Sequence, residues 1–338
     1  MSTVDDDAPA SSPKRDRWRG RMLALAVFVL APITAEYITG YDSSTGDPLV
    51  LLGSLLIFAP LYGGPALLIR ETARRTGMAW PGLLALAVAF GVLQAGIIDQ
   101  SLFSDSYRQI EDWDETFAAT YVPGLGVSAA NAVNFLAGHA IWSFAVPIAL
   151  VEGLRPELAG RPWLRLPGIV VVTLLFGAAA ALVLGDMLTH EQDHASAAQL
   201  IGSAVVIVLL IGYAMTLGRR RAPRVPRRIP RPWVLAALSL VAAFAVNLVP
   251  QTWWGVAAAV AVLAGSAAAI AFWARSVDWS GVHVVALASG ALVARTLIGF
   301  LVTPLGDVPV VAKVAHIVFF LVGGVLLGVL AWRRSRSF

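Results

Sequence analysis

Residues 166–187 have the sequence LPGIVVVTLLFGAAAALVLGDM, which contains no charged side chain before Asp186. At about 1.5 Å per residue, an α-helix of about 20 apolar residues crosses the hydrocarbon core of a membrane, which is about 30 Å thick. Stretches of this kind recur along the chain, which is 58% hydrophobic and 14% charged, with a mean hydropathy of +0.74. Soluble domains are far less apolar. The sequence therefore predicts an all-α, polytopic integral membrane protein.

We predict about ten transmembrane helices, because backbone groups inside lipid must find their hydrogen-bond partners within their own helix. The predicted spans are residues 21–40, 49–70, 79–99, 128–151, 166–187, 197–217, 232–249, 253–273, 281–302 and 309–332. The segments between them are too short for a soluble catalytic domain. The chain is thus expected to be a helical bundle within the membrane.

The basic residues predict the orientation of this bundle, because Lys and Arg are retained on the cytoplasmic side during insertion. With ten spans and both termini in the cytoplasm (N-in/C-in), all but three of the 25 Lys and Arg residues fall on the cytoplasmic side. The exceptions are Arg108, Arg295 and Lys313. We expect a multi-pass protein of the cell (plasma) membrane, which in a bacterium is the inner membrane.

The distribution of charge also divides the chain into four parts. Residues 1–20 are predicted to be a disordered cytoplasmic tail, and residues 21–217 a first half-bundle with most of the polar intramembrane residues. Residues 218–232 are a basic, Pro-rich cytoplasmic linker, followed by a second half-bundle over 233–338. The basic loops are expected to contact the anionic headgroups of membrane lipids, and nucleic acid is not an expected partner.

Several kinds of chemistry are excluded or disfavoured by the sequence. The absence of cysteine excludes disulfides and thiolate catalysis, and no nucleotide or cofactor fingerprint is present, so no cofactor is expected. The segment Thr189-His-Glu-Gln-Asp-His194 contains groups that bind zinc weakly, but a solvated acidic loop is the preferred interpretation. We therefore predict no metal site.

Polar residues inside the predicted spans gather in the outer half of the membrane. An ionisable group at this depth is costly unless it is paired or lines a hydrated cavity. We predict one outward-opening cavity that takes a small molecule, a lipid or an ion. Its candidate ligand-binding residues are Glu36, Tyr62, Gln94, Asp99, Asn131, His139, Trp142 and Arg295. An ion pair of Arg295 with Glu36 or Asp99 is a specific hypothesis, and the alternative for each acid is a helix end that reaches water.

Two predicted helices contain further signals. Phe58-Ala-Pro-Leu-Tyr-Gly-Gly-Pro65 places two prolines and a Gly-Gly pair in mid-span, which predicts a broken or sharply kinked helix with Tyr62 at the break. Asn131, Phe135, His139 and Ser143 are four residues apart and share one helix face. A histidine on such a stripe is able to relay a proton or bind a polar substrate, and satisfaction by a neighbouring carbonyl is an equal alternative.

The two ends of the first half-bundle carry other polar segments. At the inner end, Arg70-Glu71-Thr-Ala-Arg74-Arg75 and Glu152 bring carboxylates close to arginines, and we expect them to fix loop structure. At the outer end, residues 101–127 alternate aromatic and acidic side chains. That pattern predicts a short amphipathic cap that closes the cavity or meets a partner.

Parts of the first four predicted helices resemble known sequences. Tyr62–Glu71 and Gly138–Glu152 resemble segments of uncharacterised multi-spanning bacterial membrane proteins, which implies no activity. Phe135-Leu-Ala-Gly-His139 is similar to the F-x-x-x-H element of the CAAX-protease-like (CPBP) family of intramembrane proteins, and Glu71 to Arg75 has an E-x-x-x-R spacing. The chain departs from that family in having Arg70 where a second Glu is usual, in lacking a third H-x-x-x-N motif, and in placing Glu71 at the inner end and His139 in mid-span.

Three functions remain open from the sequence. The first is a non-ATP-driven transporter or a protein that binds a small molecule or lipid in the outer cavity. The second is an intramembrane enzyme, hydrolase- or protease-like, acting on a lipid or peptide with His139 as general base and Glu36 or Asp99 as its partner. The third is an accessory subunit that docks another membrane protein through its external loop.

Overall fold

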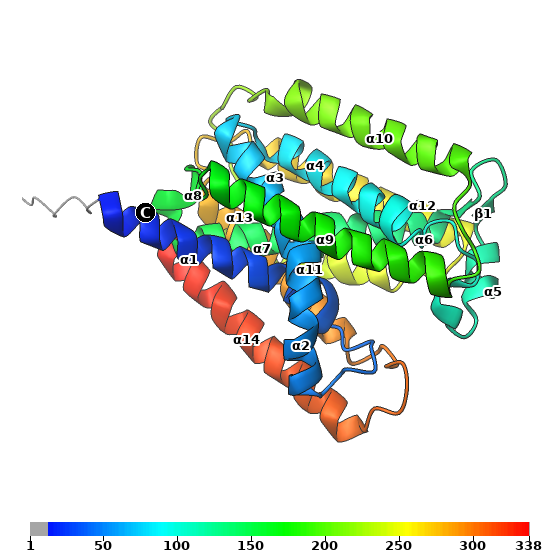
Figure 1. Ribbon diagram of the computed structural model, residues 1–338. Coiled ribbons are helices and arrows are strands. Elements are labelled where there is room, and N and C mark those ends of the chain that lie inside the picture. Colours follow the sequence, from blue (N-terminus) through cyan, green and yellow to red (C-terminus); the bar gives the residue numbers. More distant parts are fainter. Residues whose placement is uncertain (1–12, 338) are drawn as a thin grey trace, which may run out of the picture.

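The computed structural model describes residues 13–337 and is a bundle of helices (Figure 1). Within these residues, nine helical segments are long and apolar enough to cross a membrane, and a tenth apolar helix, Pro232–Asn247, is shorter. Each predicted span corresponds to one of these ten segments. The predicted all-α, polytopic membrane bundle is therefore confirmed.

The first half of the chain contains most of the interruptions in helical geometry. Its elements are α1 (Pro13–Pro32), η1 (Ile33–Tyr37), α2 (Pro48–Phe58), η2 (Ala59–Gly63), α3 (Gly64–Arg75), α4 (Trp80–Leu93), η3 (Gln94–Ile98), η4 (Tyr107–Gln109), α5 (Trp113–Ala118), β1 (Tyr121–Val122), β2 (Val127–Ser128), α6 (Ala129–Gly138), η5 (His139–Ala145), α7 (Val146–Leu154) and α8 (Pro156–Ala159). The later elements are longer and more regular: α9 (Leu166–His190), α10 (Ala197–Met215), η6 (Leu217–Arg219), α11 (Pro232–Asn247), α12 (Trp253–Trp273), α13 (Gly281–Ile298) and α14 (Val310–Arg336).

Short polar residues define where several helices begin. The Asp47 carboxylate accepts hydrogen bonds from the backbone N–H groups of Leu49 and Val50, at 3.0 and 3.1 Å, at the start of α2. Ser196 and Gln199 form a capping box at the start of α10. These caps satisfy N–H groups that have no partner within the helix, so they set the helix starts at the predicted loops.

The core of the bundle lies between the first four spans and α13. α13 packs against α7, α11 and α14. In its most apolar stretch of 18 residues, 61% of the residues are buried, compared with 11% in the corresponding stretch of each of α9, α10 and α12. Figure 1 shows α10 along one edge of the bundle and α14 along the opposite edge. The apolar faces that α9, α10 and α12 expose are suited to lipid. The two predicted half-bundles are in direct contact through α7.

The end of the N-terminal tail and the Pro-rich linker are more ordered in the structure than the sequence predicts. Most of the predicted disordered tail, residues 1–12, lies outside the described residues, but residues 13–20 already belong to helix α1, which corrects that boundary. The Pro-rich linker has no helix between residues 220 and 231. It is held in place, because the Val225 N–H donates to the Arg275 carbonyl at 2.8 Å and the Arg227 guanidinium donates to the Phe272 carbonyl at 2.7 Å.

The predicted break in the second span takes the form of a π-helical turn. Residues Ala59–Gly63 form η2, and the chain stays helical from Pro48 to Arg75. α2 has no buried residue and in Figure 1 stands across the direction of α1. Of the two predicted forms, a break and a sharp kink, only the break is wrong, because one wide turn accommodates Pro60 without unwinding the backbone.

The loop between α4 and α6, which the sequence predicts to be external and to form the outer cap, is hydrogen-bonded to the loop that follows α9. The Asp193 carboxylate accepts hydrogen bonds from the Ser104 hydroxyl at 3.3 Å and from the backbone N–H and hydroxyl of Ser106 at 3.2 and 2.6 Å. The backbone N–H of Arg108 donates to Glu191 at 3.0 Å. These bonds tie the outer cap to α9.

Asp193→Ala is expected to release this cap without unfolding the bundle. The Ser106 hydrogen bonds lower the pKa of Asp193, so the tether is present at neutral pH and is lost only in acid below the usual range of an aspartate, where the carboxylate gains a proton. We expect the amide hydrogen of Ser106 to exchange at least about 10-fold faster in the variant at pH 7, measured by hydrogen–deuterium exchange. Asp307→Ala, in another outer loop, is the matched control; unchanged exchange in Asp193→Ala would contradict the tether.

Candidate functional site

The first four spans each contain one π-helical segment, and each segment carries a residue predicted to bind ligand. Glu36 lies in η1, Tyr62 in η2, Gln94 in η3, and His139 with Trp142 in η5. η5 contacts both η1 and η2. A π-helical turn widens a helix, alters the direction of its side chains and is frequent at functional sites. We call Glu36, Tyr62, Gln94, Asp99, His139, Trp142 and Arg295 the outer cluster.

A proline explains how η1 and η5 are joined. Pro147 has no N–H, so a carbonyl in the preceding turn lacks its helical donor. The Trp142 carbonyl instead accepts a hydrogen bond from the hydroxyl of Thr34 in η1, at 2.6 Å. Thr34 is fully buried. The irregular backbone of one span is thus stabilised by a side chain from another, which fixes Glu36 and His139 in the same part of the bundle.

Aromatic rings connect Glu36 with His139. The Tyr62 ring stacks on the His139 ring with centroids 6.0 Å apart, and the Tyr62 phenol also interacts with the Glu36 carboxylate. The Tyr41 hydroxyl donates a short hydrogen bond to Glu36. His139 Nδ1 pairs with the Ser143 hydroxyl at 3.3 Å, and no carboxylate hydrogen-bonds to His139 within residues 13–337. A direct His–carboxylate dyad is therefore not formed in this structure.

The third span contributes a separate pair next to the same cluster. The Gln94 side-chain amide donates to the Asp99 carboxylate at 3.1 Å, and the Ser101 backbone N–H donates to its other oxygen at 3.0 Å. Gln94 is buried and Asp99 half-buried. Asp99 is also within electrostatic range of Glu36 and Tyr62. Asp99 is thus hydrogen-bonded inside the protein, so the alternative of a helix end that simply reaches water does not hold for it.

Tyr41, Tyr107 and Arg108 lie outside the spans and within electrostatic range of Glu36, and sequence reasoning did not identify them as site residues. Burial and the Glu36 carboxylate raise the pKa of Tyr41, and burial and Asp99 raise the pKa of Tyr107. Burial lowers the pKa of Arg108, but its neighbours, among them the acids Asp42 and Glu36, outweigh this and leave it raised. The two phenols therefore stay protonated and Arg108 stays charged at neutral pH. Arg108 also has a left-handed backbone, with φ 52°.

Arg295 does not form the predicted ion pair. Its guanidinium donates to the Asn247 side-chain oxygen at 3.0 Å and lies 4.9 Å from the centroid of the Trp142 ring. Neither Glu36 nor Asp99 is within 4 Å of it in the described part of the chain, although Glu36 acts on it at longer range. Its Nε is buried without a hydrogen-bond partner. The hypothesis of a direct pair is wrong for this conformation, because Asn247 occupies the position of the expected acid.

The space beside Glu36 is nearly filled in this structure. A hollow lined by Glu36, Tyr41 and His316 has a volume of about 10 Å³, which holds at most one water molecule. His316 is already engaged, because its Nε2 donates to the Tyr37 carbonyl at 2.7 Å and its Nδ1 accepts from the Gly46 N–H. The predicted cavity beside Glu36 is therefore not open to a ligand in this conformation.

Asn131 and Lys313 lie away from the cluster, whereas Trp142 belongs to it and contacts Arg295. Asn131 precedes His139 by eight residues, which is about 12 Å along a helix, and its side-chain N–H₂ is buried without a partner. Trp142 shields Arg295 and donates its ring N–H to the Ala291 carbonyl at 3.0 Å. Lys313 donates to the carbonyls of Phe300 and Val302, so it supports the loop after α13. Of the residues predicted to bind ligand, Asn131 is thus the one that the structure sets apart.

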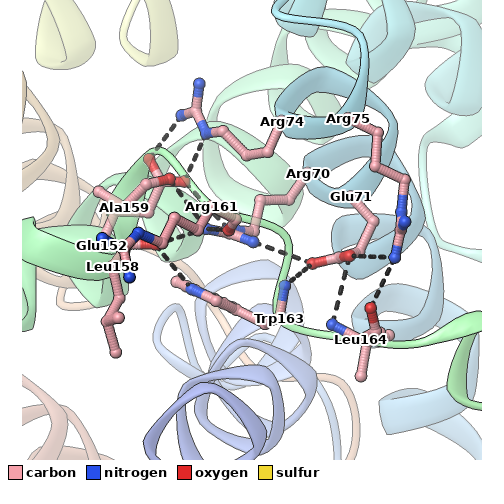
Figure 2. A network of polar contacts seen from close by, with 10 residues as sticks. All are labelled: Arg70, Glu71, Arg74, Arg75, Glu152, Leu158, Ala159, Arg161, Trp163 and Leu164. Carbon is pink, nitrogen blue, oxygen red and sulfur yellow. Dashed lines mark hydrogen bonds and ion pairs between the residues drawn. The ribbon is translucent and has the colours of Figure 1, made fainter. Parts of the chain in front are cut away.

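At the opposite end, five residues form the inner network: Arg70, Glu71, Arg74, Arg75 and Glu152 (Figure 2). Arg70 is fully buried and donates to Glu71 at 2.9 Å, to Glu152 at 3.0 Å and to the carbonyls of Ala159 and Arg161, each at 2.9 Å. Arg74 binds Glu152 at 2.6 Å. The prediction that these residues fix loop structure is confirmed.

The inner network also bears on the likeness to the CAAX-protease-like family. Glu71 follows Tyr62 by nine residues in one helical span, which is about 13 Å along the helix, whereas Tyr62 stacks on His139. The Glu71 carboxylate accepts hydrogen bonds from the Trp163 and Leu164 backbone N–H groups and is occupied. The two elements that carry that likeness therefore do not meet.

The arrangement offers hydrogen-bond donors and acceptors and a cation, Arg295, that has no ion pair among the described residues, without a preformed catalytic dyad. In the described residues, no group of three His, Cys, Asp or Glu side chains is placed to hold a metal ion. The π-helical segments are what sequence reasoning missed, and the signals for them are Pro32, Pro60 and Pro147, which lie next to or within η1, η2 and η5.

Comparison with known proteins agrees with this architecture. No curated protein and no solved structure matches the chain. A model of a family described as an uncharacterized membrane protein family matches residues 25–335, which include all ten apolar helices except the first turns of α1 and the last residue of α14. The chain is a multi-pass membrane protein and belongs to this family.

Proposed function

We propose that this protein is a non-ATP-driven transporter, or a membrane protein that binds a small molecule or lipid, and that the outer cluster is its site. The observation that carries the proposal is that η1 and η2 both contact η5, and that Asp99, directly after η3, lies within electrostatic range of Glu36. Discontinuities in neighbouring helices are typical of substrate sites in secondary transporters. A single irregular helix would be explained by packing alone.

The state of Arg295 indicates the class of ligand. A guanidinium without an acidic partner is costly inside a membrane, and the buried Nε of Arg295 has no hydrogen-bond partner among the described residues. A ligand carboxylate or phosphate would supply the missing charge and accept that hydrogen bond. The closed hollow beside Glu36 then corresponds to an occluded state, and the outer cap, with Arg108 at the mouth, is the part that moves to admit the ligand.

Arg295→Gln is expected to weaken binding of an anionic ligand by about 10- to 100-fold, since a hydrogen bond to a charged group contributes about 1.5–3 kcal/mol. The measurement is the thermal unfolding midpoint of the purified protein titrated with small carboxylates and phosphates, each paired with its neutral amide or alcohol. Arg275→Gln, in a cytoplasmic-end loop, is the matched control. The proposal fails if no carboxylate or phosphate stabilises the wild type, or if both variants lose binding equally.

The enzyme alternative has less support. A general base needs a partner that orients it, and His139 has the Ser143 hydroxyl at 3.3 Å and aromatic rings as its neighbours. The accessory-subunit alternative also loses support, because the outer cap is tied to its own chain through Asp193 and Glu191. His139→Ala separates the enzyme from the transporter or binding protein. An enzyme would lose turnover and keep ligand binding, whereas a binding protein would change only in affinity.

A further inference from the structure

A second hollow lies at the opposite end of α1 from Glu36. Its volume is about 470 Å³, within the range of pockets that hold a small ligand or a headgroup. It is bounded by the first turns of α1 and by the loop from Leu158 to Gly168 that leads into α9. This is the end of the bundle that the arginine distribution predicts to be cytoplasmic, so the hollow lies at headgroup depth.

The charge of this hollow is strongly one-sided. Arg17, Arg21, Arg161 and Arg165 line it against one acid, Asp16. Asp16 lies 3.8 Å from the Arg161 guanidinium and 3.9 Å from that of Arg19. In the part of the chain described here, Arg17, Arg21 and Arg165 have no ion pair. Three arginines that line one space and have no ion pair among the described residues favour a multiply accepting anion such as a phosphate ester.

The inner network holds the wall of this hollow rigid (Figure 2). The Arg70 guanidinium lies 3.1 Å from the centroid of the Trp163 ring and donates to the Arg161 carbonyl. Glu71 accepts the Trp163 N–H at 2.7 Å, and Arg75 donates to the Leu164 carbonyl at 2.6 Å. A wall fixed in this way loses little conformational entropy when a ligand binds.

The surroundings favour a ligand with acyl chains. Trp18 is 62% exposed, Met22 42% and Leu166 72%, and all three lie beside the arginines in sequence. Such apolar side chains at the membrane edge provide contact for lipid tails. The hollow also meets the start of α9, a helix of 25 residues whose dipole favours an anion at this end. A free phosphate would not use the apolar rim.

We propose that this hollow binds the phosphate headgroup of an anionic membrane lipid, and that Arg17, Arg21 and Arg165 are the residues that bind the phosphate. The site is independent of the outer cluster and of the function proposed for it. The inner network is then a positioning device, since it shapes the loop that carries Arg161, Trp163 and Arg165.

The test uses native mass spectrometry of the full-length protein, with phosphatidylglycerol as the probe and phosphatidylcholine as the neutral lipid. Each arginine near an anionic lipid contributes a factor of about five, so Arg17→Gln/Arg21→Gln/Arg165→Gln is expected to weaken phosphatidylglycerol binding by about 100-fold. Arg219→Gln/Arg220→Gln/Arg221→Gln removes the same charge from the linker and is expected to change binding less than about threefold. Circular dichroism of both variants checks that they fold.

The outcomes separate this site from general surface charge and from a site for free phosphate. Equal weakening by the two triple variants, or equal binding of the two lipids by the wild type, would overturn the proposal. Glycerol phosphate, which has the phosphate but no acyl chains, is expected to bind at least about 10-fold more weakly than the lipid. Binding of equal strength would overturn the lipid as occupant. None of these results depends on whether Arg295 binds an anion.

Discussion

Arg70→Met is expected to lower the free energy of unfolding by about 3–5 kcal/mol, because it removes the central member of a buried ionic network. Arg70 is fully buried, and its Nε and both terminal nitrogens are hydrogen-bonded to carboxylates or carbonyls. Methionine keeps most of the side-chain volume of Arg70. The loss of stability therefore reports the cost of leaving Glu71, Glu152 and the backbone carbonyls without their hydrogen-bond donor. The measurement is unfolding by sodium dodecyl sulfate in mixed micelles, followed by circular dichroism.

Arg155→Met is the control for this variant. Arg155 lies 3.9 Å from Glu157, and both side chains are 37% exposed, so the pair contributes about 1 kcal/mol or less. The difference between the two variants measures burial and hydrogen bonding, since both lose one arginine near the same end of the bundle. A similar, small loss in both would show that the inner network is not a determinant of stability.

Gly63→Ala is expected to cost about 3 kcal/mol and to disturb the outer cluster, because η2 packs directly on α1. A Cβ atom at position 63 would lie 2.0 Å from the carbonyl oxygen of Phe28 and 2.6 Å from the Cα of Phe28. Because both are backbone atoms, the clash is relieved only if η2 and α1 move apart. Tyr62 would move with η2, away from the His139 ring. We expect both the unfolding free energy and the affinity for an anionic ligand to fall.

Gly53→Ala, in α2 of the same span, is the matched control. A Cβ at position 53 has nothing within 4 Å, and alanine is the better helix former, so we expect unchanged or slightly higher stability. If Gly63→Ala behaved like Gly53→Ala, the close approach of η2 and α1 would not exist in solution.

The helical spans were predictable because each one satisfies its own backbone. A stretch such as residues 166–187 has to be helical in lipid whatever its neighbours are, and all ten predicted spans are present with ends that differ by a few residues. The exception is α1, which begins at residue 13, within the predicted tail. The helix continues through Gly20, so neither this glycine nor the polar residues before the span end it.

The candidate site was predictable only as a set of residues. The cost of polar groups inside a membrane identified Glu36, Tyr62 and His139, and the structure brings these three together. The partner of Arg295 was not predictable, because Asn247 and the two acids are equally plausible from sequence and only helix packing selects Asn247. The wide turns were not predicted either, since proline indicates an irregularity without specifying its form.

By itself, the sequence determined that the chain crosses the membrane several times and that its basic residues lie on alternate loops, since both follow from the transfer of single segments between water and lipid. Tertiary structure decided which polar groups meet. It left Arg295 without an acid, occupied every nitrogen of Arg70, and gathered Arg17, Arg21 and Arg165 around one hollow. Such contacts join residues that are distant in sequence, so they depend on how helices pack and rotate against each other, which hydropathy does not encode.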